Sequence, residues 1–313
     1  MSAPSDNGIE VSLPELIALR LRTRRLARPA QRVSGIHAST HASRFRGRGV
    51  DYAESRIYQP GDDIRQMDWR VTARSGKPHT KLFEEEREQS TLLIVDENPS
   101  LRFGTRVRFK SVQAARAAAL IAWTAARNGD RIGALGFGGG IDGEVKPAGG
   151  ARGALRVLRA LVEWNAAAKH DVHAPLSQAL QRARRLARPG SRVIVLSDGF
   201  SADDDARGPL SLLADHCDVA AIVLEDALEL AAPTPGRYAL HGESGRVLLD
   251  FAAARTRADW QRWFRQRRAH LLDLLAKRAL RSILLQTHEE PDAAVARLLG
   301  GETRGHGAGV RIA

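Results

Sequence analysis

The arrangement of apolar residues along the chain changes at Ser90. Beyond this point, segments in which apolar residues recur every three or four positions alternate with short uninterrupted apolar runs, at 91–95, 131–137, 192–196 and 218–224. Such runs are typical of strands buried on both faces of a parallel sheet, and the three-to-four spacing predicts helices with one buried face. The predicted helices are 108–128, 151–164, 175–187, 209–216, 256–277 and 291–299. The alternation predicts an α/β fold with a doubly wound, mostly parallel sheet.

Two further patterns predict short antiparallel strands. Glycines at 138–140 follow the second apolar run and predict a hairpin turn into a strand at 144–146. A phosphate-binding loop is disfavoured there, because the cluster lacks a Gly-Lys-Ser/Thr ending and no helix follows it directly. Short strands are also expected at 237–240 and 246–249.

The first part of the chain follows a different pattern. Ser12 and Glu15 are spaced as a capping box, and they predict a helix that begins there and ends before Pro29. Residues 31–49 have a Ser-, His-, Gly- and Arg-rich loop composition, and 49–87 mixes short apolar alternation with turn signals. We therefore expect three parts, which are a basic N-terminal extension at 1–89, an α/β domain at 90–300 and a tail at 301–313.

The chain is strongly basic, with a formal net charge of +12 and a sequence pI of about 10.8. Such a charge attracts nucleic acid, acidic protein faces or anionic lipid. The excess is carried by arginine, however, and the codon bias of a GC-rich genome would produce the same composition. The predicted helix 256–277 raises the same alternatives, because Trp260, Trp263 and Phe264 form a stripe suited to packing while arginines fill much of its remainder.

Several sequence features bear on the cellular compartment. No run of about 18 uncharged apolar residues exists, so no transmembrane helix is predicted. The N-terminus lacks the basic-then-apolar layout of a signal peptide. Cys217 is the single cysteine, which excludes an internal disulfide framework and a multi-cysteine metal site. We therefore expect a cytoplasmic protein, with peripheral membrane contact left open.

Candidate chemistry lies where the predicted strands end. Asp96 directly follows the first apolar run, and Asp198 follows the run at 192–196. Ligands of doubly wound sheets bind at the carboxyl ends of strands, which points to the loops after Val95, Asp171 and Leu196. Two carboxylates there suit a hard cation such as Mg²⁺, with hydroxyls and waters completing its coordination. The alternative is that both aspartates cap the turns or helices that follow them.

This layout resembles the von Willebrand factor type A domain, in which a D-x-S-x-S motif and a later S-D-G build a metal-ion-dependent adhesion site for Mg²⁺. By this resemblance the metal ligands would be Asp96, Asn98, Ser100 and Asp198. Asn98 replaces the first serine of the motif, and Ala174 stands where a threonine is usual. The resemblance therefore implies a degenerate site, in which Asn98 ligates through its carbonyl oxygen or holds a water.

A second resemblance lies upstream. The stretch YQPGDDIR at 58–65, then Asp68-Trp69-Arg70, Ala73-Arg74, Lys81 and EEER at 84–87, is similar to the signature of the bacterial "domain of unknown function fifty-eight" family. That family carries this signature just before a von Willebrand factor A-like domain and commonly occurs beside MoxR-type AAA+ ATPases. The resemblance implies partnership with such an ATPase, and with other von Willebrand factor A-like proteins.

These observations favour a non-enzymatic adaptor or chaperone-like interaction module that works with a MoxR-type AAA+ ATPase in protein maturation or complex assembly. One alternative is a basic nucleic-acid-binding protein, although no recognition-helix or zinc-finger signature is present. Another is a metal-dependent hydrolase that uses Asp96 and Asp198. No lysine or histidine motif for a general acid stands out in the sequence, which disfavours the hydrolase.

Overall fold

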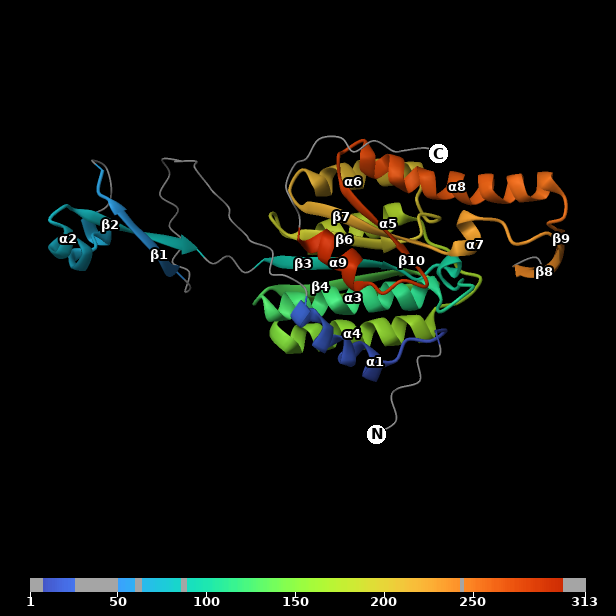
Figure 1. The fold of residues 1–313 in the computed structure, drawn as a ribbon, viewed down its shortest axis with the longest axis horizontal. Helices are drawn as coiled ribbons and strands as arrows, with labels where there is room; N and C mark the ends of the chain where they lie inside the picture. The colour runs from blue at the N-terminus through green and yellow to red at the C-terminus, as the bar shows by residue number, and fades with distance from the viewer. Residues whose placement is uncertain (1–7, 26–49, 60–63, 86–88, 243–244, 301–313) are drawn as a thin grey trace. The chain divides into compact units, whose positions relative to one another are not determined.

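The computed structural model describes residues 8–25, 50–59, 64–85, 89–242 and 245–300 (Figure 1). The chain divides into two compact units. Among the described residues, the larger unit comprises 8–25 with 89–300, and the smaller comprises 50–85. The N-terminal helix, which we expected in the extension, therefore belongs to the same unit as the sheet. The expected tail at 301–313 lies outside the described residues.

The larger unit is built on a six-stranded sheet with the strand order β10-β7-β6-β3-β4-β5. All neighbouring strands are parallel except β4 and β5, which form the antiparallel hairpin predicted from the glycine turn. The predicted, mostly parallel α/β sheet is thus confirmed. The strands are β3 (Ser90–Asp96), β4 (Arg131–Gly138), β5 (Ile141–Gly149), β6 (Arg192–Ser197), β7 (Asp218–Glu225) and β10 (Arg281–Gln286).

Helices cover both faces of this sheet (Figure 1). Successive residues of β3 point to opposite faces, so Leu93 and Val95 lie in one apolar core while Leu92 and Ile94 lie in the other. The first core is completed by α3 (Lys110–Arg127), α4 (Gly150–Ala167) and α9 (Asp292–Leu299). The second is completed by α5 (Leu176–Leu186), α6 (Arg207–Ala214) and α8 (Ala254–Ala276). Burial on both faces explains why the central strands are uninterrupted apolar runs.

Shorter elements connect these layers. The antiparallel hairpin of β8 (Arg237–Gly242) and β9 (Gly245–Asp250) precedes α8, as the sequence predicted. A short helix, α7 (Ala227–Leu230), follows β7. Two 3-10 turns lie beside the carboxyl ends of strands, η3 (Pro99–Leu101) after β3 and η4 (Asp204–Ala206) after β6.

The smaller unit contains an antiparallel pair, β1 (Val50–Ile57) with β2 (His79–Glu85), together with η2 (Ile64–Gln66) and α2 (Trp69–Ser75). Asp68 caps α2, because its Oδ1 accepts hydrogen bonds from the backbone nitrogens of Arg70 and Val71, both at 3.1 Å. Ser55 on β1 donates to Asp68 Oδ2 at 2.7 Å. The Asp-Trp-Arg triplet of the signature therefore begins a helix and ties it to the strand pair. Residues 60–63 and 86–87 of the signature lie outside the described residues.

The N-terminal helix differs in detail from its prediction. It consists of α1 (Leu13–Ala18) and the 3-10 segment η1 (Leu19–Arg25), and it packs against α3 and α4. The expected capping box is wrong, because the Ser12 side chain makes no capping hydrogen bond. Glu15 instead pairs with the buried Arg116 of α3. An ion pair with a distant helix thus replaced the local cap that the spacing suggested.

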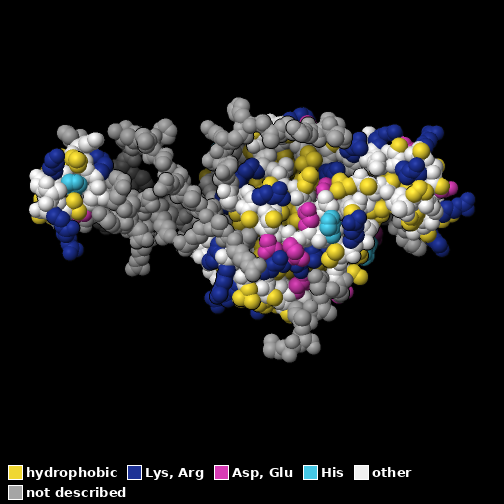
Figure 2. All heavy atoms as spheres, viewed as in Figure 1, with side chains coloured by type: hydrophobic (Ala, Val, Ile, Leu, Met, Phe, Trp, Pro, Cys, Tyr) yellow, Lys and Arg dark blue, Asp and Glu magenta, His cyan; other side chains and the backbone are white. Residues whose placement is uncertain are grey.

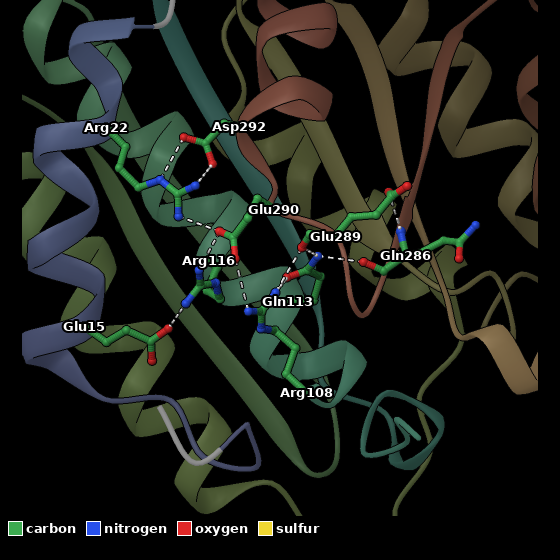
Figure 3. A network of polar contacts seen from close by, with 9 residues as sticks. All are labelled: Glu15, Arg22, Arg108, Gln113, Arg116, Gln286, Glu289, Glu290 and Asp292. Atoms are coloured by element: carbon green, nitrogen blue, oxygen red, sulfur yellow. Dashed lines mark hydrogen bonds and ion pairs between the residues drawn. The ribbon is translucent and has the colours of Figure 1, made fainter. Parts of the chain in front are cut away.

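A polar network connects this N-terminal helix to the other end of the unit (Figure 3). Glu290, just before α9, lies 2.5 Å from Arg22 Nη1, 2.9 Å from Arg116 Nη2 and 3.4 Å from Arg108 Nη2. Arg22 also pairs with Asp292 at 2.7 Å. Arg108 lies just before α3 and Arg116 lies within its first two turns. One carboxylate therefore joins three segments that are far apart in the sequence.

Candidate functional site

The three loops expected to form a site meet at the carboxyl edge of the sheet. The Asn98 side chain, after β3, accepts a hydrogen bond from Ala174 N at 2.8 Å and donates to Ala174 O at 3.0 Å. The Ala174 loop continues into α5, whose first backbone nitrogen, of Leu176, donates to Ser201 O at 2.8 Å. Ser201 follows β6. Amide and backbone groups therefore close the junction of the three loops without a metal ligand between them.

Asp96 is fully buried and forms the centre of this junction. Its Oδ1 accepts hydrogen bonds from Asn98 N at 2.9 Å and from Asn98 Nδ2 at 2.7 Å. Its Oδ2 accepts from Ser197 Oγ and Ser201 Oγ, both at 2.7 Å. Burial and the nearby charge of Asp198 raise the pKa of Asp96 to about 6, although the hydrogen bonds from Ser201, Ser197 and Asn98 act in the opposite direction.

Asp198 lies in a separate ionic cluster, which we call the lysine centre and define as Lys110, Asp198 and Glu229. Lys110 Nζ lies 2.7 Å from Asp198 Oδ2 and 2.5 Å from Glu229 Oε1. Both Lys110 and Asp198 have side chains that are 0% exposed. Burial lowers the pKa of Lys110, but the charges and hydrogen bonds of the two carboxylates outweigh it and leave that pKa raised. Lys110 is therefore a permanent cation inside the protein.

The arrangement does not fit the adhesion-type metal site that the resemblance implies. The Asp96 carboxylate accepts four hydrogen bonds from protein donors. The Asn98 amide is also bonded at both ends: its oxygen accepts from Ala174 N, and its nitrogen donates to Asp96 and to Ala174 O. Lys110 already neutralises Asp198. Ser100 Oγ is buried and makes no hydrogen bond with another described residue, so of the four expected ligands only Ser100 has an uncommitted oxygen. Among the described residues, no three His, Cys, Asp or Glu side chains group as a metal site would.

Glu97 is a second buried carboxylate beside Asp96. It is 1% exposed, and neither of its carboxylate oxygens makes a hydrogen bond of ordinary geometry within the described structure. Burial raises the pKa of Glu97 to about 8, with Arg102 and the Asn165 amide close enough to lower it in part. A carboxyl group with this pKa is mostly protonated at neutral pH, which removes the cost of burying its charge.

The glycine turn between β4 and β5 packs directly against these acidic residues. Gly138 has a positive φ of 82°, and a Cβ atom there would lie 2.5 Å from Asn98 Cγ. A Cβ on Gly139 would lie 2.6 Å from the backbone oxygen of Glu97. Glycine is thus needed both for the turn and for close approach to the 97–98 loop. The turn fixes Asn98 from one side, while Ala174 holds it from the other.

Aromatic and arginine side chains cover the lysine centre. The Phe200 ring lies 4.8 Å from Lys110 Nζ. Trp263 and Arg267, both from α8, pack against Phe200. The ring centroids of Trp263 and Phe200 are 5.7 Å apart. The Arg267 guanidinium lies 5.7 Å from the Phe200 ring centroid. The Arg267 guanidinium also stacks 4.6 Å from the Trp263 ring. We call Phe200, Trp263 and Arg267 the aromatic cap, and its Trp263 is 47% exposed.

Two hollows of the larger unit lie away from these carboxylates. One of about 500 Å³ is lined by residues of α5 and α6, including Arg184 and Leu212. Another of about 350 Å³ is lined by β5 and α4, including Glu144 and Trp164. Neither is lined by Asp96 or Asp198. Since a hydrolase needs a space in which substrate meets its carboxylates, these hollows give the hydrolase alternative no support.

Sequence reasoning identified the two aspartates but missed their partners. Lys110, Glu229, Ser197 and Ser201 were not among the expected site residues, and the structure separates Asp96 from the lysine centre by giving each its own partners. One signal for Lys110 was present. It is the first residue of a largely apolar helix, where a cation opposes the helix dipole and so requires a compensating carboxylate.

None of the described helices combines the length and the apolar content that crossing a bilayer requires.

Comparison with known proteins places the chain among relatives. The family model described as "Protein of unknown function DUF58" matches residues 54–270. Uncharacterized proteins of Mycobacterium tuberculosis and Mycobacterium bovis are each 33% identical to the chain over 274 residues, which is 84% of this chain and 86% of each relative.

Solved structures resemble the chain more distantly. The conserved hypothetical protein BatB from Bacteroides thetaiotaomicron has a TM-score of 0.45 at 12% identity, covering 67% of this chain and 96% of that one. An aerotolerance-related membrane protein from Bacteroides fragilis has a TM-score of 0.40 at 11% identity, covering 66% and 94%. Similarity at this level does not transfer a function.

Proposed function

This chain belongs to the family of proteins of unknown function DUF58, and we propose that it is a non-enzymatic adaptor that binds a protein partner at the carboxyl edge of its sheet. The observation that carries the proposal is the aromatic cap on the lysine centre. At the edge where doubly wound proteins bind ligands, the buried Lys110 pairs with Asp198 and Glu229 beneath an exposed Trp263 and a stacked Arg267. Trp and Arg are the residues in which binding energy concentrates at protein interfaces.

Partner binding in this proposal is independent of a metal ion. The ammonium group of Lys110 supplies the positive charge that Mg²⁺ would otherwise bring to Asp198 and Glu229. Its interaction with the Phe200 ring connects that charge to the surface, because a cation under an aromatic face holds the ring in position. The lysine centre thereby acts as a rigid base for the aromatic cap, and a partner meets a surface that is already ordered.

We further propose that the partner is a MoxR-type AAA+ ATPase and that the pair acts in the cytoplasm in protein maturation or complex assembly. Support comes from the signature in 58–87, which resembles that of proteins that commonly occur beside such ATPases. The single cysteine is consistent with a reducing compartment.

Affinity capture from the native host tests this proposal. The full-length chain and its Trp263→Ala variant are immobilised separately, and captured proteins are identified by mass spectrometry. We expect an AAA+ ATPase with the wild-type chain and little or none with the variant. A matched control is Trp69→Ala, because Trp69 is 66% exposed and belongs to the smaller unit. Loss of capture with Trp69→Ala but not with Trp263→Ala would overturn the proposed binding surface, and capture of no such ATPase would overturn the proposed partner.

A further inference from the structure

The hairpin of β8 and β9 and the start of α8 form a distinct surface, which we call the basic projection and define as residues 237–242 and 245–262. In Figure 2, this end of the larger unit shows Lys and Arg side chains mixed with apolar ones. We propose that the basic projection docks the protein on an anionic lipid surface. This inference is independent of the proposed adaptor function, because it uses the outer face of α8 and the hairpin and leaves the aromatic cap free.

One face of the hairpin is packed and the other is not. Tyr238 opposes Leu249 in the register of the hairpin and packs on Phe251, with ring centroids 5.6 Å apart. Phe251 in turn packs on Trp260 of α8 at 5.2 Å. Leu248 opposes Ala239, so it points to the opposite face, and it is 62% exposed. Leu248 is thus held in water on the unpacked face, whereas Val247, which is 46% exposed, lies on the same face as Leu249.

Arginines lie in the same segment as Leu248. Residues 237–262 contain five arginines and three carboxylates. Arg237 is 75% exposed on the hairpin, Arg255 is 94% exposed at the start of α8, and Arg262 is 63% exposed two turns further along the same helix face. Asp250 pairs with Arg237 at 3.8 Å, and Asp259 pairs with Arg255 at 3.8 Å and with Arg262 at 2.9 Å. Three arginines therefore share two carboxylates, and a positive excess remains.

The combination favours a lipid surface over the other anionic partners. Phosphates of a nucleic acid would satisfy the arginines but would leave Leu248 in water. A bilayer interface accepts both groups, because aliphatic side chains enter the acyl boundary while arginines stay at the headgroups. Each basic side chain near an anionic membrane contributes on the order of a fivefold increase in binding. Leu248 adds the favourable transfer of apolar surface out of water.

Vesicle cosedimentation of the full chain tests the proposal. The probes are phosphatidylcholine vesicles with and without phosphatidylglycerol. We expect binding to the anionic vesicles that weakens at high salt, and little binding to the neutral ones. Arg237→Gln with Arg255→Gln should lower binding roughly 30-fold, and Leu248→Ser should lower it several-fold. Matched controls on exposed positions elsewhere are Arg184→Gln with Arg185→Gln, and Leu212→Ser, which should bind like the wild type.

Three outcomes would overturn the proposal. The first is equal binding to neutral and anionic vesicles. The second is equal loss in the control variants, which would show that overall charge, and not the basic projection, binds lipid. The third is absence of vesicle binding. If the protein then binds duplex DNA, the arginines are assigned to nucleic acid. Circular dichroism spectra identical to the wild type show that each variant remains folded.

Discussion

Lys110 and Asp198, 88 positions apart in the sequence, form an ion pair of 2.7 Å in which both side chains are completely buried. Glu229 lies on the other side of the same ammonium group, at 2.5 Å. Because Lys110 begins α3 and Asp198 follows β6, the pair joins the start of a helix to a loop at the carboxyl edge of the sheet. The cation at this edge is thus supplied by the chain itself.

Removing this cation should destabilise the protein strongly. Lys110→Met leaves two carboxylates buried without their partner, which costs about 3–5 kcal/mol of the free energy of unfolding. Urea denaturation measures the loss. The control is Lys277→Met, because Lys277 pairs with Asp273 in a surface position where both side chains are more than half exposed, and such pairs contribute about 0–1 kcal/mol. Equal effects of the two substitutions would show that the lysine centre is not an important source of stability. Adding Asp198→Asn and Glu229→Gln to Lys110→Met should recover part of the loss.

Mg²⁺ should leave the wild-type protein unchanged. Protein donors satisfy Asp96, and Lys110 neutralises Asp198, so a divalent cation gains no strong ligand set. Calorimetric titration of the metal-stripped chain should give no binding heat, and the melting temperature should not rise with added Mg²⁺. Binding heat that disappears in Asp96→Ala would contradict this interpretation and restore the adhesion-type site at Asp96, Asn98, Ser100 and Asp198.

Glu97 should make stability depend on pH. Its pKa is raised from 4.5 to about 8 in the folded protein, so the folded state holds more protons than the unfolded state between these values. Stability from this group is therefore present below about pH 4.5 and is lost as the pH rises to about 8, by on the order of 5 kcal/mol. Denaturation at several pH values should show this decline in the wild type.

The Glu97→Gln variant separates this effect from others. It cannot ionise, so it should keep its stability between pH 6 and pH 8, where the wild type continues to lose it. A remaining slope up to about pH 6 is expected, because Asp96 has a raised pKa of about 6. A variant whose pH profile matches the wild type across pH 6–8 would rule out Glu97 as the titrating group.

The sequence predicted most of the larger unit because its signals are local. The central strands are buried on both faces, and the resulting apolar runs predicted the core of each, such as 91–95 within Ser90–Asp96. The strand β10 was missed. It lies at an edge of the sheet, and its Ile283, Leu284 and Leu285 form too short a run to stand out between a long helix and a loop.

The candidate site was harder to predict, because its contacts join distant segments. The loops after β3 and β6 were expected to meet, and they do. The pairing of Lys110 with Asp198 depends on the rotation of α3 about its axis, which apolar spacing fixes only coarsely. The capping box at Ser12 was also wrong because of a contact between distant segments. The Glu15 side chain pairs with Arg116 on α3.

Glu290 should determine how firmly the N-terminal helix is attached. Arg22, Arg108 and Arg116 all contact its carboxylate, and burial, which would raise the pKa of Glu290, is outweighed by these arginines, so the pKa is lowered. Because the side chain is 49% exposed, Glu290→Ala should cost only roughly 1 kcal/mol. Hydrogen exchange should nonetheless become faster in residues 13–25. Asp215→Ala is the control, as its carboxylate is 48% exposed and contacts Arg278 alone among the ion pairs described. Unchanged exchange in 13–25 would exclude this attachment role.

The central claim is that the aromatic cap binds the protein partner, and the dissociation constant for the purified ATPase tests it most directly. Calorimetric titration of the wild-type chain, Trp263→Ala and Trp69→Ala gives three values under one set of conditions. We predict that Trp263→Ala weakens binding about 30-fold or more, as expected for an interface tryptophan, and that Trp69→Ala stays within about twofold of the wild type. Wild-type affinity in a folded Trp263→Ala variant would contradict the claim.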